Sequence, residues 1–317
     1  MTQGAGVLTR KILLMGLRRS GKSSIRQVIF HGMQPIETLY LESTTRITSE
    51  VLKSLGDFVI EEIPGQHDVM NIEADLTALF QGVSSVIYVI DSQDEYLMAL
   101  QNVVQVIEQG YKVNQGIHFE VLVHKIDGLN DEFRLDTKRD IIQRINDDLI
   151  DIGVYDADIT YHMTSIFDQS IIEASSRIIQ KLVPELSSLT QMLDLFTVRT
   201  GIEKVFLFDS ATKLYIATDS SPVDAEICQV CSDFISISSE LGALYNSSTS
   251  KQQVGQDFSL SRLQNGTIIT LAHMFNGLLL VGLSTHEVPM QATLTEFNME
   301  MFRDGMKKIY EGIIPIS

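Results

Sequence analysis

The chain has 317 residues, of which 44% are hydrophobic and 21% are charged, as in a globular protein with room for two cores. Its formal net charge of −17 argues against direct binding to nucleic acid or to an anionic membrane through a broad basic face. No apolar run approaches the roughly 18 residues of a membrane span, and residue 2 (Thr) and the ending Ile-Pro-Ile-Ser carry no myristoylation or prenylation signal. We therefore expect neither a membrane span nor a lipid anchor.

The chain has two cysteines, Cys228 and Cys231, too few for a disulfide framework. Their C-x-x-C spacing is compatible with a redox or zinc site. However, no second Cys or His pair stands at ligand spacing, and the flanking residues favour a helix over a strand and turn. We interpret them as thiols packed on a helix, consistent with a reducing compartment.

A short glycine-containing segment near the start of the chain is the most informative feature of the N-terminal half. Residues 12–15 are an apolar run typical of a buried strand, and residues 16–23 (GLRRSGKS) then fit G-x-x-x-x-G-K-[ST] at every fixed position. In this pattern the glycines let backbone N–H groups turn towards phosphate oxygens. Lys22 carries a charge to the β- and γ-phosphates, and the Ser23 hydroxyl is placed to ligate Mg²⁺. Residues 24–31 are compatible with a helix whose positive end faces the same anion, so the segment predicts a nucleotide-phosphate site.

Strands and helices alternate through the first 183 residues. The sequence predicts strands at residues 57–63, 86–91, 119–123 and 159–163, and helices at residues 68–81, 95–109, 134–152 and 171–183. Residues 32–50 have an irregular pattern. This alternation is typical of βαβ units, so we expect an α/β P-loop NTPase fold with a mostly parallel sheet and ligand loops at the strands' carboxyl ends.

The pattern changes at Pro184, which we take as the boundary between a domain of residues 1–183 and a domain of residues 184–317. Helices are expected at residues 185–198, 222–245 and 290–310, and strands at residues 204–209, 213–219, 258–263, 267–273 and 277–283. Residues 246–255 form a polar loop. Hairpin-connected strands flanked by helices indicate an α+β module, and the absence of an evident catalytic cluster favours an interaction domain.

Two segments favour guanine as the base. Residues 124–127 (HKID) follow a predicted strand, where the Asp127 carboxylate can accept hydrogen bonds from guanine N1–H and the N2 amine. Adenine lacks both donors, and a site built around a buried carboxylate rejects a base that leaves it unpaired. The stem of Lys125 can lie over the base, and backbone N–H groups of residues 164–166 (TSI) can contact guanine O6.

A third segment, residues 62–66 (EIPGQ), follows the strand predicted at residues 57–63. The Gly65 amide can hydrogen-bond a γ-phosphate, and Gln66 stands where a side chain would position the attacking water. Glu62 occupies a place that usually holds Asp, which binds Mg²⁺ through a water. Its extra methylene displaces the carboxylate by about a bond length.

The chain resembles the C/D-type Rag GTPases, and the fungal member in particular, in GLRRSGKSS, TLYLEST, PGQ, YVIDSQDEY, HKID, YHMTSIFDQSI and, in the second domain, FLFDSATKLYIATDSSPVD. The resemblance implies a Ras-like G domain followed by a roadblock/longin-type domain, through which the chain forms a heterodimer with an A/B-type Rag GTPase. It also implies attachment through a Ragulator/EGO-type scaffold to the cytoplasmic face of the vacuole or lysosome, with further pools in the cytoplasm and nucleus. There the pair recruits the target-of-rapamycin kinase complex when amino acids are plentiful.

The resemblance also implies roles for individual residues. Gln66 acts in hydrolysis, and Mg²⁺ is held by Ser23, Thr44 and, through a water, Glu62. Thr44 is the best match for the switch I threonine, with Thr38 and Thr45 left open. His124 replaces the Asn common in Ras-like proteins and ties the base loop to the phosphate loop by a hydrogen bond. Phosphate binding is assigned to Arg18, Arg19, Ser20, Gly21, Lys22, Ser23, Ser24 and Gly65, and guanine binding to His124, Lys125, Asp127, Ser165 and Ile166.

We therefore expect a guanine-nucleotide-binding switch subunit that binds GTP or GDP with Mg²⁺ and hydrolyses GTP slowly. A GTPase-activating protein is expected as a partner, because no Arg of the second switch is placed to act in cis. The alternative is a nucleotide-stabilised scaffold with little useful hydrolysis, which Glu62 supports and Gln66 opposes. The guanine motif argues against a small-molecule kinase or ATPase built on the same loop.

Overall fold

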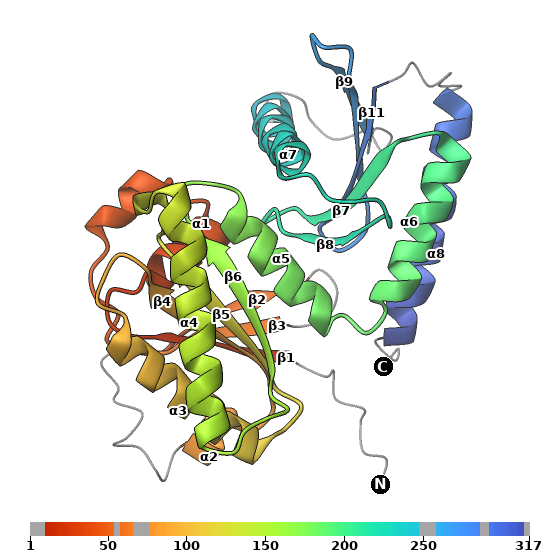
Figure 1. Ribbon diagram of the computed structural model, residues 1–317. Helices are drawn as coiled ribbons and strands as arrows, with labels where there is room; N and C mark the ends of the chain where they lie inside the picture. Colours follow the sequence, from red (N-terminus) through yellow and green to blue (C-terminus); the bar gives the residue numbers. More distant parts are fainter. Residues whose placement is uncertain (1–9, 54–57, 66–75, 247–257, 286–291, 314–317) are drawn as a thin grey trace, which may run out of the picture. The chain divides into compact units, whose positions relative to one another are not determined.

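The computed structural model describes residues 10–53, 58–65, 76–246, 258–285 and 292–313 (Figure 1). The chain divides into two compact units, and the division falls between Ala174 and Ser175, inside helix α5 (Ser170–Leu182). The boundary expected at Pro184 follows directly after this helix. The polar loop expected at residues 246–255 lies, except for Asn246, outside the described residues.

The first unit is built on a six-stranded sheet with the order β2-β3-β1-β4-β5-β6. Its strands are β1 (Arg10–Gly16), β2 (Thr48–Leu52), β3 (Phe58–Glu62), β4 (Val83–Asp91), β5 (His118–His124) and β6 (Asp158–Thr164). All neighbouring pairs are parallel except β2–β3, which is antiparallel. The mostly parallel α/β sheet predicted from the sequence is therefore confirmed.

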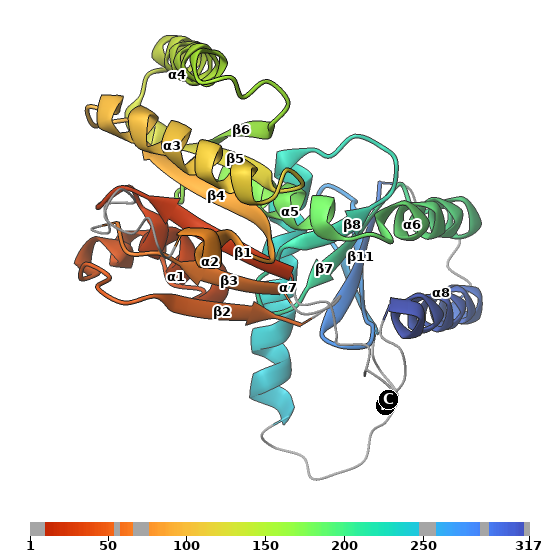
Figure 2. The same ribbon diagram turned by 90° about the horizontal axis from the view of Figure 1, so that it is seen from below.

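Helices alternate with these strands as the pattern predicted, and residues 68–75 of the helix expected at residues 68–81 lie outside the described residues. Besides α5 they are α1 (Lys22–His31), α2 (Leu76–Phe80), α3 (Leu97–Val113) and α4 (Asp131–Asp151), with short 3₁₀ turns at η1 (Pro35–Tyr40) and η3 (Ile126–Gly128). Helices α3 and α4 lie on one face of the sheet (Figure 2). Ile141, Ile145 and Leu149 of α4 are buried at intervals of four residues, the spacing that places apolar side chains on one side of a helix.

The stretch expected to be irregular, residues 32–50, contains η1 and most of β2. The sequence of β2 is Thr-Ser-Glu-Val-Leu, and Val51 is exposed while Leu52 is buried. As an edge strand, β2 is held by backbone pairing with β3 rather than by a buried apolar face. Its sequence consequently lacks the alternation of apolar and polar residues from which strands are recognised.

The second unit contains a five-stranded antiparallel sheet with the order β8-β7-β11-β10-β9. Its elements are α6 (Leu186–Thr200), β7 (Lys204–Asp209), β8 (Tyr215–Thr218), α7 (Ala225–Asn246), β9 (Phe258–Arg262), β10 (Ile268–His273), β11 (Leu278–Ser284) and α8 (Ala292–Ile313). Each predicted helix and strand of this half is present. The arrangement is consistent with a roadblock-like domain.

Helices cover both faces of this second sheet (Figure 1). On one face, α7 packs Cys228, Cys231 and Ile235 against buried residues of the strands. On the other face, α6 and α8 lie side by side, and the rings of Phe196 and Phe302 meet edge to face with centroids 5.5 Å apart. The two cysteines are thus buried thiols on one helix, and burial raises the pKa of Cys231 strongly.

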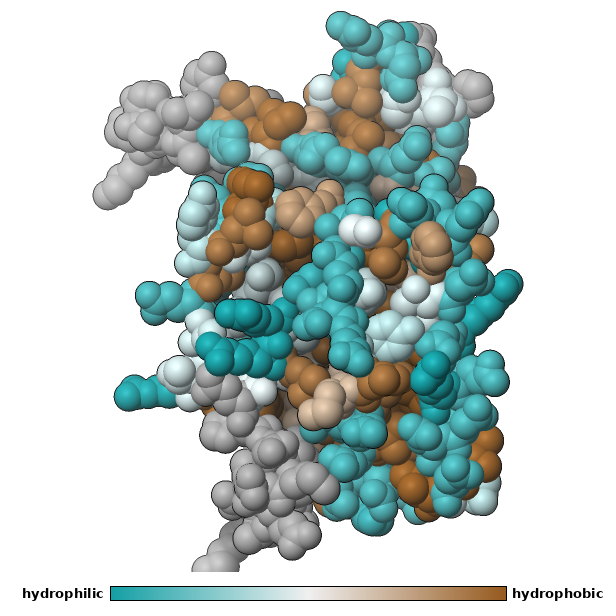
Figure 3. All heavy atoms as spheres, turned by 60° about the vertical axis from the view of Figure 1, so that its left-hand side comes forward, coloured by the Kyte–Doolittle hydropathy of each residue, from teal (hydrophilic) through white to brown (hydrophobic). Residues whose placement is uncertain are grey.

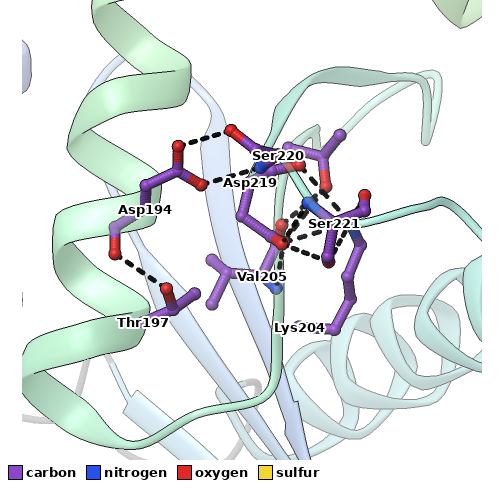
Figure 4. A network of polar contacts seen from close by, with 8 residues as sticks. Asp194, Thr197, Lys204, Val205, Asp219, Ser220 and Ser221 are labelled. Carbon is purple, nitrogen blue, oxygen red and sulfur yellow. Dashed lines mark hydrogen bonds and ion pairs between the residues drawn. The ribbon is translucent and has the colours of Figure 1, made fainter.

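A polar network fixes the loop after β8 (Figure 4). The Lys204 ammonium lies 3.1 Å from Asp219 Oδ1 and donates to the carbonyl of Ser221 at 2.7 Å. Asp219 Oδ1 also accepts the backbone N–H of Val205 at 3.0 Å, and Asp194 of α6 accepts the N–H of Ser220 at 2.7 Å. The buried Lys204–Asp219 pair therefore has the hydrogen bonds that a desolvated ion pair needs.

The surface drawn in Figure 3 shows small hydrophobic patches separated by hydrophilic side chains. Within the described ranges, no helix is both long enough and apolar enough to cross a membrane.

Candidate nucleotide site

The phosphate loop joins β1 to α1 at the carboxyl edge of the first sheet. No side chain caps the N-terminus of α1, so its first N–H groups are left for a ligand. The Lys22 ammonium donates to the carbonyls of Gly16 and Leu17, both at 2.9 Å, and so closes the loop around it. Burial lowers the pKa of Lys22 to about 8, and nearby Glu62 opposes this effect. A bound phosphate would favour the charged ammonium in the same way.

Two glycines make close approaches that a side chain would block. Gly21 has φ +107°, and a Cβ there would lie 2.6 Å from the Cδ2 atom of His124. A Cβ on Gly65 would lie 2.5 Å from the backbone N of Arg18 and the backbone C of Leu17. The loop at Gly65 therefore runs directly against the phosphate loop, where its amide can reach a terminal phosphate.

Three predicted Mg²⁺-binding residues converge beside the phosphate loop. The Ser23 hydroxyl lies 2.7 Å from the Thr44 hydroxyl and donates a hydrogen bond to Glu62 Oε1. Two oxygens in neighbouring positions around an octahedral Mg²⁺, each about 2.1 Å from the ion, lie about 3.0 Å apart. The Ser23–Thr44 pair, 2.7 Å apart, is close to this spacing. Because the Ser23 proton is donated to Glu62, Thr44 donates to Ser23, and one Ser23 lone pair remains for a cation. These residues therefore fit a magnesium ion.

Of the three threonines considered for switch I, only Thr44 is in contact with Ser23 in the described structure. The hydroxyl of Thr38 donates to the carbonyl of Pro35 at 2.7 Å, inside η1, and Thr45 is exposed. The sequence could not make this choice because it depends on how the loop after η1 lies against α1.

Arg26 belongs to the same cluster and was missed from the sequence. Its Nε donates to Glu62 Oε2 at 2.9 Å, and its Nη1 donates to Glu50 Oε1 at 2.7 Å. It lies three residues after Ser23 on α1 and resembles an ordinary polar helix residue in the sequence. Glu62 itself could have indicated such a residue, since a Glu at the end of a core strand needs a cationic partner.

At the base end, Asp127 is oriented by Ser165. The Ser165 hydroxyl donates to Asp127 Oδ1 at 2.6 Å and is fully buried, and it also accepts the N–H of Phe167 at 3.1 Å. Ile166 beside it is half-buried. The two loops predicted to read guanine thus meet after β5 and β6, neighbouring parallel strands of the sheet.

Lys125, rather than His124, ties the base loop to the phosphate loop by a hydrogen bond. Its ammonium donates to the carbonyl of Arg19 at 2.9 Å and pairs with the Asp91 carboxylate. His124 Nδ1 instead lies 2.9 Å from the Thr164 hydroxyl, while the ring edge rests against Gly21. Burial, with a smaller contribution from Lys125, lowers the pKa of His124 to about 4, so the imidazole is neutral near pH 7.

The remaining residues predicted for phosphate binding and hydrolysis differ in how far they are buried. The Ser20 hydroxyl is buried and has no hydrogen-bond partner among the described residues. Arg18 and Arg19 are exposed, and the Arg18 guanidinium lies 3.3 Å from the Ser43 hydroxyl; Ser24 is half-buried. Gln66 lies outside the described residues. A buried hydroxyl without a partner inside the phosphate loop is suited to accept or donate to a ligand.

A parallel sheet carrying this phosphate loop, the Ser23–Thr44–Glu62 cluster and the Asp127–Ser165 pair defines a P-loop G protein of the Ras-like class. The model of the Gtr1/RagA G protein conserved region matches residues 11–235. The chain is 44% identical over 314 residues to GTP-binding protein GTR2 of Saccharomyces cerevisiae, covering 94% of this chain and 92% of the relative. It is 41% identical over 313 residues to human Ras-related GTP-binding protein C (97% and 78% covered), but only 26% identical over 216 residues to GTP-binding protein GTR1 of Saccharomyces cerevisiae (67% and 69% covered). The chain belongs to the Gtr/Rag family of G proteins and is of the C/D type.

Proposed function

We propose that the chain is the C/D-type subunit of a Rag heterodimer and acts as a switch between Mg²⁺-GTP and GDP states. The observation that carries this proposal is the convergence of Ser23, Thr44 and Glu62 beside the phosphate loop. Thr44 belongs to the loop before β2, so a γ-phosphate and Mg²⁺ would hold that loop, and their loss would release it. The protein would supply a charged Lys22 to the phosphates, and the ion would neutralise developing charge on them.

We further propose slow hydrolysis of GTP with Gln66 positioning the water. The purified chain, alone and with an A/B-type partner, should contain guanine nucleotide when extracted, and GTP should be converted to GDP in a single-turnover assay. Gln66→Leu should retain GTP binding and lose the conversion. An activating protein would accelerate turnover by supplying an arginine. Tight nucleotide binding without conversion, even with an activating protein, would identify a nucleotide-stabilised scaffold instead.

The second unit offers a surface for the A/B-type partner. Val230, Ile237 and Leu241 of α7 are exposed apolar residues at intervals of seven and four, which places them on one side of the helix. Leu260 on the edge strand β9 is also exposed. An exposed apolar stripe on a helix and a strand at the edge of the described sheet are suited to pairing with a second, similarly built domain.

This assignment is tested by co-purification with the partner. Leu241→Asp or Ile237→Asp should abolish the heterodimer, because a charge would be buried in the interface. Val198→Asp is a matched control, since Val198 is an exposed apolar residue of α6, on the opposite face of the sheet. Loss of the heterodimer with Val198→Asp and not with the α7 variants would place the interface on the other helical layer.

We also propose that the pair reaches the cytoplasmic face of the vacuole or lysosome through a Ragulator/EGO-type scaffold and there recruits the target-of-rapamycin kinase complex. Membership of the C/D type supports this proposal. Fractionation of cells should show the chain on vacuolar or lysosomal membranes, and deletion of the scaffold should release it into the cytoplasm.

A further inference from the structure

The fully buried carboxylate of Glu62 is shared between two elements. Its Oε1 accepts the Ser23 hydroxyl, and its Oε2 accepts Arg26 Nε at 2.9 Å, both from α1. Thr48 of β2 lies directly opposite Glu62 in the β2–β3 pairing, and its hydroxyl is 3.4 Å from Oε2. Because a buried carboxylate needs a counter-charge and hydrogen bonds, these donors fix how Glu62 is turned.

Arg26 connects this carboxylate to the strand that follows switch I. While its Nε holds Glu62, its Nη1 donates to Glu50 Oε1 of β2 at 2.7 Å. His31 Nε2 lies 2.9 Å from the same Glu50 oxygen. Burial raises the pKa of Glu50, but hydrogen bonds from His31 and Arg26 outweigh burial and lower it overall. One planar guanidinium therefore spans β3 and β2 from α1 with two N–H groups in a fixed fork, whereas a lysine ammonium would be a point charge on a flexible stem.

The extra methylene of Glu62, compared with Asp, gives its carboxylate an additional rotatable bond. Without a fixed partner, the carboxylate could turn away from Ser23 and leave the hydroxyl without its acceptor. Arg26 affects the proposed Mg²⁺ site in two opposite ways. Its charge offsets the negative charge that attracts Mg²⁺, while its hydrogen bond keeps Oε1 directed at Ser23 by holding Oε2.

We propose that the orienting hydrogen bond from Arg26 outweighs the effect of its charge, so that Arg26 is a positioning residue for Mg²⁺-dependent retention of nucleotide. Through Glu50, Arg26 also couples the site to β2. The guanidinium contacts the oxygen of Glu62 that does not accept from Ser23, so it orients the carboxylate without occupying the cation side. The inference rests on the proposed Mg²⁺-nucleotide site and adds the residue that makes a Glu usable there.

The test measures how much Mg²⁺ slows nucleotide release. The full chain is loaded with fluorescent GDP, and the dissociation rate is measured in excess Mg²⁺ and in excess EDTA. Arg26→Met should reduce the ratio of the EDTA rate to the Mg²⁺ rate by about tenfold or more, the lower range for losing an outer contact of a metal site. The EDTA rate should equal that of the unaltered chain, because phosphate-loop and guanine contacts remain.

Companion variants separate positioning from folding. Arg26→Lys keeps the charge but loses the fixed fork that directs one N–H at each acid, so it should lower the ratio as well. This variant tests the inference if Arg26→Met does not fold. Lys11→Met is the matched control: it removes a cation paired at 2.9 Å with Glu61, the neighbour of Glu62 on β3, and should leave the ratio unchanged. A ratio equal to or above that of the unaltered chain in both Arg26 variants overturns the inference. Absence of any Mg²⁺ effect in the unaltered chain would overturn the proposed Mg²⁺ site itself.

Discussion

The pH dependence of stability tests how His124 is packed between the base loop and the phosphate loop. Burial lowers its pKa to about 4, whereas an unfolded histidine has a pKa near 6.5. The unfolded chain therefore takes up a proton between these values that the folded chain does not. Stability from this group is complete above about pH 6.5 and declines as the pH falls towards about 4.

The size of the effect follows from the two pKa values. Lowering the pH from 7.5 to 5.5 should reduce the free energy of unfolding by about 1 kcal/mol through His124 alone, and the whole difference between the two pKa values corresponds to about 3 kcal/mol. His124→Asn should lack this contribution. Unfolding of both proteins in urea is measured at the two pH values through amide exchange of β5 and β6. The change in the free energy of unfolding with pH is then compared between the two proteins. Other groups titrate in both proteins and cancel, and pH 5.5 stays above the isoelectric point of about 4.7.

An equal decline in both proteins would refute this argument, because it would mean that His124 is protonated in the folded chain at pH 5.5. The ring would then have to leave Gly21 and become hydrated. A larger decline in His124→Asn than in the unaltered chain would refute it equally.

Three further substitutions test the site. Ser23→Asn should weaken Mg²⁺-GTP binding by more than tenfold relative to GDP binding in competition assays, since it removes a ligand of the ion; equal losses would contradict the role of Ser23. Asp127→Asn should lower GDP affinity at least about hundredfold and favour xanthine nucleotides, whose C2 oxygen can accept a hydrogen bond from the new amide. If the variant still prefers guanine nucleotides, Asp127 is not the residue that recognises the base. Gly65→Ala should lower GTP affinity roughly tenfold and change GDP affinity little, because its Cβ would lie 2.5 Å from backbone atoms of Arg18 and Leu17 and would displace the amide.

The sequence predicted the helices and strands well where a buried face imposes a period. The strand β4 is a nearly continuous buried run, and α4 repeats buried residues every fourth position, so both are recognisable locally. The strand β2 was missed because its pairing with β3, a feature of the folded sheet, determines its conformation.

The candidate site was predictable where one segment contains all the chemistry. The phosphate loop and the HKID segment are of this kind, and Asp127 is placed beside Ser165 because their strands are neighbours in a parallel sheet. The roles of Thr44 and Arg26 were harder to predict, because they depend on contacts between residues far apart in the sequence. Thr44 contacts Ser23, 21 positions away, and Arg26 contacts Glu62, 36 positions away. Likewise, only the fold shows that Lys125 reaches the carbonyl of Arg19, a residue 106 positions away.

The same contacts change how the departure at Glu62 should be judged. Considered alone, a Glu where an Asp is usual suggests a weakened cation site, and it was the main support for a scaffold that does not hydrolyse nucleotide. In the folded chain, however, Oε1 of Glu62 accepts the Ser23 hydroxyl directly, and Arg26 takes up the other oxygen. The longer side chain is therefore accommodated by a partner on α1 rather than left free. Support for a non-hydrolysing scaffold must then come from the chemistry at Gln66, and the Gln66→Leu comparison becomes the measurement that separates a switch from a scaffold.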